Sequence, residues 1–96
     1  MNYEEFIASL KSAECPAQVN PRLRALWHDA AGDWDTAHEI VQQLNDAGAA
    51  RIHAYLHRKE GDHGNAKYWH RQAGSAYPEH MSLEQEWASL VASFVD

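Results

Sequence analysis

Residues 21–78 read PRLRALWHDAAGDWDTAHEIVQQLNDAGA (21–49) followed by ARIHAYLHRKEGDHGNAKYWHRQAGSAYP (50–78), and the two halves align without a gap at a period of 29 residues. A repeat of this length is typical of stacked supersecondary units, here two helix–turn–helix hairpins. One hairpin alone cannot bury its apolar stripe, so we expect the stacking of the two to create the core. The identical pairs are Arg22/Arg51, Ala25/Ala54, His28/His57, Gly32/Gly61, Asp33/Asp62 and Ala37/Ala66.

Glycines and capping residues divide the chain into six predicted helices. Glycine takes a positive φ at low cost, and the aspartate that follows it is a preferred N-cap, so Gly32-Asp33 and Gly61-Asp62 predict the two hairpin turns. Gly48 and Gly74 are expected to end helices in the same way. No segment shows the alternation of a half-buried strand, and the prediction is an all-α fold. The expected helices cover residues 3–14, 50–60 and the segments that begin after the caps Asn20, Asp33, Asp62 and Ser82.

A chain of 96 residues has room for one domain of ordinary size. We expect residues 1–96 to form that single domain. Residues 1–19 supply an N-terminal capping helix and a linker, 21–49 and 50–78 are the two repeats, and 81–96 form a C-terminal capping helix.

The stretches GDWDTAHEIVQQL (32–44) and GDHGNAKYWHRQAGSAYP (61–78) resemble the turn and second helix of tetratricopeptide (TPR) repeats. The Gly-Asp turn, the alanine five residues after the glycine and the later Pro78 match that pattern, and the segment from Ala66 to Gly74 is also similar to a Sel1-like repeat. The period of 29 residues is shorter than the usual 34 of that family. The resemblance implies TPR-like α-hairpins in which the first helix of each hairpin lines a ligand groove.

Charge and composition exclude several classes of protein. Asp and Glu outnumber Lys and Arg by 14 to 8, which argues against a general nucleic-acid binder and against a polybasic membrane-surface protein. The single cysteine, Cys15, cannot form an internal disulfide bond. No long apolar run and no basic leader-like segment is present in the sequence. A cytoplasmic protein is therefore expected.

The two repeats carry opposite charge. Residues 21–49 hold two basic and five acidic side chains, a net charge of -3, whereas residues 50–78 hold five basic and two acidic ones, a net charge of +3. In a TPR-like fold the second repeat would present a basic groove, where an arginine can grip a carboxylate with two hydrogen bonds. We predict that an unknown protein or acidic peptide binds there. The expected binding residues are Arg51, Tyr55, His57, Arg58 and Lys59.

The predicted function is therefore a non-enzymatic adaptor or regulatory module. Changing Arg58 to glutamate is expected to weaken an acidic partner without unfolding the domain. The simpler interpretation of the charges is a solvated helix surface. A third possibility is a self-assembling structural protein, in which the basic repeat of one copy meets the acidic repeat of another in a homo-oligomer.

Seven histidines in so short a chain suggest a second class of function. His53 and His57 stand at i, i+4 on one predicted helix, a spacing that presents two imidazoles to one metal ion. Glu60 lies on the same stripe, and His28 is the repeat equivalent of His57. A histidine-rich metal-binding protein is thus an alternative prediction, and surface or interface histidines that titrate near neutral pH are the simpler interpretation.

Catalytic motifs are absent from the sequence. The serines have no Gly-x-Ser-x-Gly context, Cys15 is in no recognised nucleophile motif, and no glycine-rich phosphate loop occurs. We therefore expect no enzyme activity and no cofactor. The four tryptophans each fall on the apolar stripe of a different predicted helix, which favours core packing over an aromatic ligand pocket.

Overall fold

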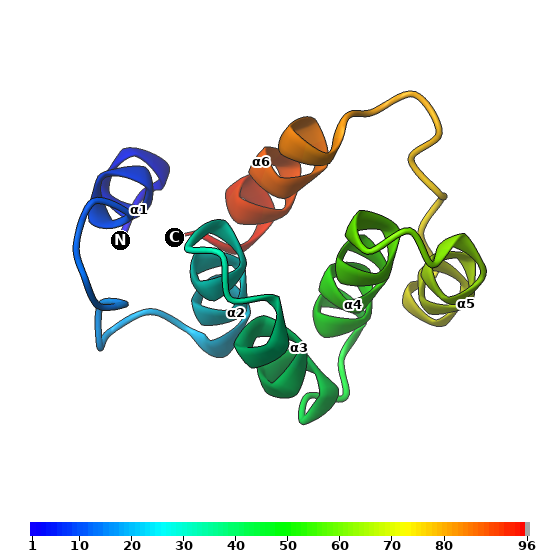
Figure 1. The fold of residues 1–96 in the computed structure, drawn as a ribbon, viewed down its shortest axis with the longest axis horizontal. Coiled ribbons are helices and arrows are strands. Elements are labelled where there is room, and N and C mark those ends of the chain that lie inside the picture. Colours follow the sequence, from blue (N-terminus) through cyan, green and yellow to red (C-terminus); the bar gives the residue numbers. More distant parts are fainter. Residues whose placement is uncertain (96) are drawn as a thin grey trace.

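The computed structural model describes residues 1–95 and consists of helices joined by turns (Figure 1). No strand occurs among these residues, which confirms the all-α fold with about six helices. None of the six is long and apolar enough to cross a membrane. Asp96, the last position of the predicted capping segment, lies outside the described residues. The helices are α1 Tyr3–Ser9, α2 Pro21–Ala30, α3 Trp34–Gln42, α4 Ala47–Lys59, α5 His63–Ala73 and α6 Leu83–Phe94.

Helices α2 and α3 form one hairpin and α4 and α5 form a second, with the same turn in each. Gly32 and Gly61 both have φ +88°, and Asp33 and Asp62 cap the helices that follow. In each turn the aspartate N–H donates at 2.9 Å to the carbonyl oxygen five residues earlier. The structure thus confirms the turn positions that the sequence repeat predicts.

Two helix boundaries differ from the sequence prediction. Helix α4 begins at Ala47, not at residue 50, because Asp46 caps it and accepts the N–H of Ala49 at 2.7 Å. Gly48 therefore lies in the first turn of α4 and does not end a helix. The Phe94 ring approaches it so closely that a Cβ added at Gly48 would lie 2.8 Å from the ring. Helix α1 ends at Ser9, before the expected residue 14, because the next N–H groups donate to carbonyl oxygens three residues earlier, not four.

Helix α6 closes the core by packing against α2 and α4, as Figure 1 shows. Its Trp87 indole N–H donates to the carbonyl oxygen of Leu26 at 3.0 Å, and the Trp87 ring lies 6.1 Å from that of Phe6 in α1. The main apolar cluster joins buried side chains from five of the six helices, all but α5. Its largest fully buried members are Phe6, Leu26, Val41, Ile52, Leu56, Leu90 and Val91.

Candidate functional site

Three histidines from two helices converge on one point. His38 comes from α3, and His53 and His57 stand one turn apart on α4. One ring nitrogen from each lies within 4.8 Å of the others. The Nε2 atoms of His38 and His53 are 3.0 Å apart, close to the separation of about 3.3 Å between two nitrogens bound to a tetrahedral zinc ion at 2.0–2.1 Å. The cluster therefore has the dimensions of a metal site.

Aromatic rings hold the histidines in place. The His38 ring stacks on Trp34 with centroids 4.9 Å apart, and the His53 ring stacks on Trp69 at 3.9 Å. The rings of His53 and His57 stack on each other at 5.0 Å, as their i, i+4 spacing allows. Trp34 is itself fixed, because its indole N–H donates to the carbonyl oxygen of Leu56 at 2.8 Å.

A carboxylate sets the proton position on His57. Its Nδ1 lies 2.7 Å from a carboxylate oxygen of Glu60, so Nδ1–H donates there and Nε2 is the nitrogen that keeps its lone pair. Histidines that bind metals normally donate their second N–H to a carboxylate, a carbonyl or water, which orients the ring and raises its basicity. Glu60 gives His57 this arrangement.

Burial keeps two of the imidazoles in the form that binds metals. Desolvation, with a smaller contribution from His38 and His57, lowers the pKa of His53 to about 4. Desolvation also lowers the pKa of His38 below its usual value, with His57 as the second cause. Both rings are therefore neutral at pH 7, and a metal ion displaces no proton charge from them. His53 and His57 are buried, so the interpretation of the histidines as surface groups does not fit these two residues.

The structure brings together only part of the predicted metal-binding set. His53 and His57 belong to the cluster, but Glu60 binds His57 Nδ1 from outside it. His28, the repeat equivalent of His57, lies elsewhere and packs edge-on against Trp27 at 5.2 Å. His38 was missed because its repeat equivalent is a lysine, and no spacing rule joins α3 to α4. Its i, i+4 spacing from Trp34 is the one local signal.

A second group, His57, Glu60 and Asp62, also has ligand atoms within 4.8 Å of one another. Its two carboxylates are exposed and already used. Glu60 accepts from His57, and Asp62 caps α5 by accepting the backbone and side-chain N–H groups of Asn65 at 3.2 and 2.8 Å. The three-histidine cluster is therefore the stronger candidate for a metal site.

Part of the expected basic groove is directed into the protein. The Tyr55 side chain is buried, and its hydroxyl donates at 2.8 Å to the buried carboxylate of Asp29 in α2. The Lys59 ammonium group donates to the other oxygen of the same carboxylate at 2.9 Å. Asp29 of the first repeat thus binds the side chains of both Tyr55 and Lys59. An acid of the protein itself occupies the position expected for an acid of a partner molecule.

Arg58, the next residue of the expected groove, faces helix α6. Arg58 donates at 2.8 Å to the buried carboxylate of Glu86 and also to the carbonyl oxygen of Met81. Arg51 is half-buried, and its charge acts on the same carboxylate, whose pKa burial nevertheless raises. His57 is buried in the histidine cluster. Arg58 thus binds an acid of the chain's own helix α6 and is not free to grip a partner's carboxylate as expected. Arg58→Glu would place two carboxylates together. Partner binding itself stays a prediction.

Fold and site together define an all-helical protein of stacked hairpins with a three-histidine cluster between its third and fourth helices. Comparison of the chain with protein-family models, with curated proteins and with solved structures gives no match. The similarity to TPR and Sel1-like repeats therefore stays a prediction, and the function has to be argued from the site alone.

Proposed function

We propose that this protein binds a late first-row transition metal ion, with zinc as the first candidate, through His38, His53 and His57. The observation that supports the proposal is the convergence of three imidazole nitrogens within 4.8 Å, one of them oriented by the carboxylate of Glu60. A carboxylate that accepts the second N–H is the partner that metal-bound histidines normally have.

The donor set selects the class of metal. Imidazole nitrogen suits zinc, copper, nickel and cobalt, whereas magnesium and calcium prefer oxygen ligands. Three protein ligands leave a fourth tetrahedral position for water or another small ligand. Because His38 belongs to α3 and the other two to α4, the ion would also join the first hairpin to the second.

The test is a titration of metal-free protein with Zn²⁺ by calorimetry, repeated with Co²⁺, whose visible absorption reports nitrogen coordination. We expect one equivalent to bind to the wild type. Single changes of His38, His53 or His57 to alanine should each weaken the binding of that equivalent strongly, because only two ligands remain. Glu60→Gln should retain it with about 10- to 100-fold lower affinity, the usual cost of losing an outer partner.

His80→Ala is the matched control, because His80 is exposed and lies outside the cluster. This variant should bind Zn²⁺ as the wild type does. Equal Zn²⁺ affinity of the wild type and of a variant lacking all three cluster histidines would contradict the proposal, as would an equal loss of affinity in the control.

A further inference from the structure

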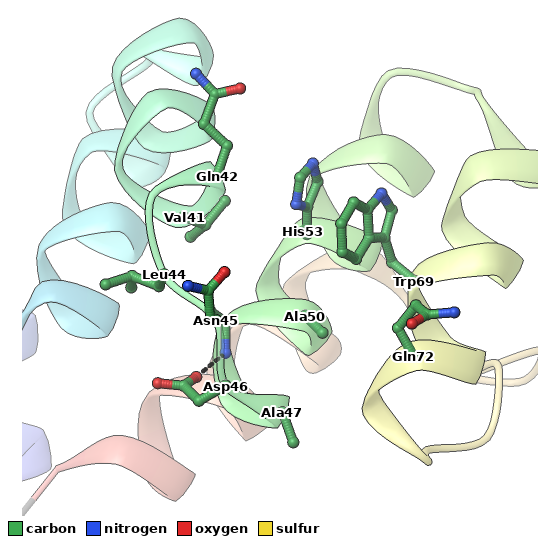
Figure 2. Close-up of a pocket in the computed structure, with 11 residues that line it drawn as sticks. Val41, Gln42, Leu44, Asn45, Asp46, Ala47, Ala50, His53, Trp69 and Gln72 are labelled. Carbon is green, nitrogen blue, oxygen red and sulfur yellow. Dashed lines mark hydrogen bonds between the residues drawn. The ribbon is translucent and has the colours of Figure 1, made fainter.

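A cavity of about 290 Å³ lies next to the histidine cluster, between the end of α3, the start of α4 and one side of α5. Figure 2 shows His53 and Trp69 on one side of it and the side chains of α3 on the other. Three side-chain amides line the cavity, those of Gln42, Asn45 and Gln72. Its size and its neutral polar lining suit a small molecule that accepts hydrogen bonds.

The charges around the cavity leave it without a cation of its own. No lysine or arginine lines it, and its one lining acid, Asp46, is neutralised by an ion pair with Arg22 and by capping α4. Ala47, Ala49 and Ala50 in the first turn of α4 also form part of the lining, so the positive end of that helix dipole faces the space. Since Asp46 caps this same helix end, its carboxylate and the dipole offset each other, and an anion would meet a nearly neutral field there.

His53 connects this cavity to the metal cluster. Its Nε2 faces Nε2 of His38, but its Nδ1 has no hydrogen-bond partner within residues 1–95. In Figure 2 one ring nitrogen of His53 is directed towards the α3 side of the cavity. The ring therefore touches the cluster with one nitrogen and the cavity with the other.

Metal binding fixes what that second nitrogen does. A metal ion on Nε2 requires the lone pair of Nε2, so the single proton of the neutral ring must sit on Nδ1. Nδ1–H is then a donor that needs an acceptor, and a ligating histidine normally finds a carboxylate, a carbonyl or water for it. Glu60 fills this role for His57, and no side chain of the described residues fills it for His53.

We infer that the cavity binds a small carboxylate, which accepts the Nδ1–H of His53 together with N–H groups of the amide side chains that line the cavity. Such a carboxylate would be to His53 what Glu60 is to His57. The charge of the metal ion, transmitted through the imidazole, strengthens this hydrogen bond, so metal and carboxylate bind cooperatively and each raises the affinity for the other by the same factor. The inference rests on the metal proposal above.

The experiment measures the Zn²⁺ affinity at fixed free Zn²⁺, set by a chelator buffer, in sodium acetate and in sodium chloride of equal ionic strength. We expect about tenfold tighter binding in acetate, at the lower end of the effect of an outer-sphere carboxylate. Gln42→Leu with Gln72→Leu should remove most of the acetate effect and leave the affinity in chloride unchanged. Gln43→Leu is the matched control, because Gln43 is exposed, adjacent in sequence and outside the lining.

The Co²⁺ protein distinguishes the inferred contact from direct coordination. A carboxylate on His53 Nδ1 should leave the visible bands of Co²⁺ nearly unchanged, whereas acetate bound to the metal would shift them in the wild type and in the glutamine variants alike. That shift, or equal Zn²⁺ affinities in acetate and chloride, would overturn the inference and leave metal binding intact. Absence of Zn²⁺ binding in chloride would instead refute both proposals.

Discussion

Gly61 and Gly64 lie three residues apart and have opposite requirements. Gly61 has φ +88° at the hairpin turn, whereas Gly64 lies in the first turn of α5 without a positive φ. A Cβ at Gly61 would meet no atom within 4 Å, and one at Gly64 would make an ordinary contact of 3.9 Å with Asp62. Backbone conformation, not space, therefore separates the two sites.

We predict that Gly61→Ala lowers the free energy of unfolding by about 1–2 kcal/mol, the cost of a side chain in left-handed backbone. Gly64→Ala should raise it by about 0.4–1 kcal/mol, since alanine restricts the unfolded chain and favours helix. Urea denaturation followed by circular dichroism measures both. Equal effects of the two changes would mean that the turn does not hold Gly61 in its positive φ.

Single residues show where sequence reasoning succeeds. The roles of Gly61 and Asp62 were predictable because a helix end imposes local constraints. It requires a residue that can take a positive φ and a side-chain oxygen that accepts an N–H group within three residues. Lys59 and Tyr55 were misassigned because their partner, Asp29, is 26 to 30 residues away in another helix. Nothing in the local pattern distinguishes a basic side chain that faces solvent from one that faces a buried carboxylate.

Helix α6 is attached to α4 by an ion pair inside the protein. The side chains of Arg58 and Glu86 are only 14% and 6% exposed, and a second contact joins Arg58 to the carbonyl oxygen of Met81. His70 of α5 lies beside this ion pair: its Nε2 is 3.7 Å from Glu86, and its Nδ1 is 2.8 Å from the Ser75 hydroxyl. Removing one member therefore leaves a buried charge without its partner.

We predict that Arg58→Met destabilises the protein by about 3–5 kcal/mol, because Glu86 loses its counter-ion in a buried position. The double change Arg58→Met, Glu86→Leu should recover most of that loss, since a well-packed apolar pair is often no less stable than a buried ion pair. Urea denaturation of the wild type, both single variants and the double variant measures the coupling. A double variant no more stable than Arg58→Met would contradict the assignment of the pair.

At the level of elements, capping motifs predicted the helix starts well, and the fourth helix shows why one start was missed. Gly48 carries the same glycine signal as Gly32 and Gly61, but Asp46 precedes it and caps α4. The glycine instead allows the close approach of Phe94 from α6. A contact with a helix 46 residues away decides the role of this position, and such contacts are invisible to local pattern.

The packing of α6 and the meeting of α3 with α4 are properties of the whole molecule. The period of 29 residues indicated two hairpins, and the structure has them, but the repeat does not say which helix returns to cover which face. That return replaced the expected groove with a buried interface. The same packing brought His38 next to His53, a pair separated by 15 residues and by the junction of the two hairpins.

A metal ion at this junction should stabilise the whole fold. Because the unfolded chain keeps the three histidines apart, the ion binds the folded state preferentially, and at 100 times its Kd it contributes about 2.7 kcal/mol. For a domain of this size we predict a rise in Tm of roughly 10–20 °C. Differential scanning calorimetry with and without Zn²⁺ measures it.

His38→Ala is the decisive variant, because it removes the ligand on α3 and leaves both histidines of α4 in place. Two ligands on one helix bind more weakly and no longer bridge the hairpins, so the Zn²⁺-dependent rise in Tm should fall to a few degrees or less, whereas His80→Ala keeps the full rise. An equal rise in His38→Ala would place the stabilising ion on α4 alone, and α3 would then carry no ligand.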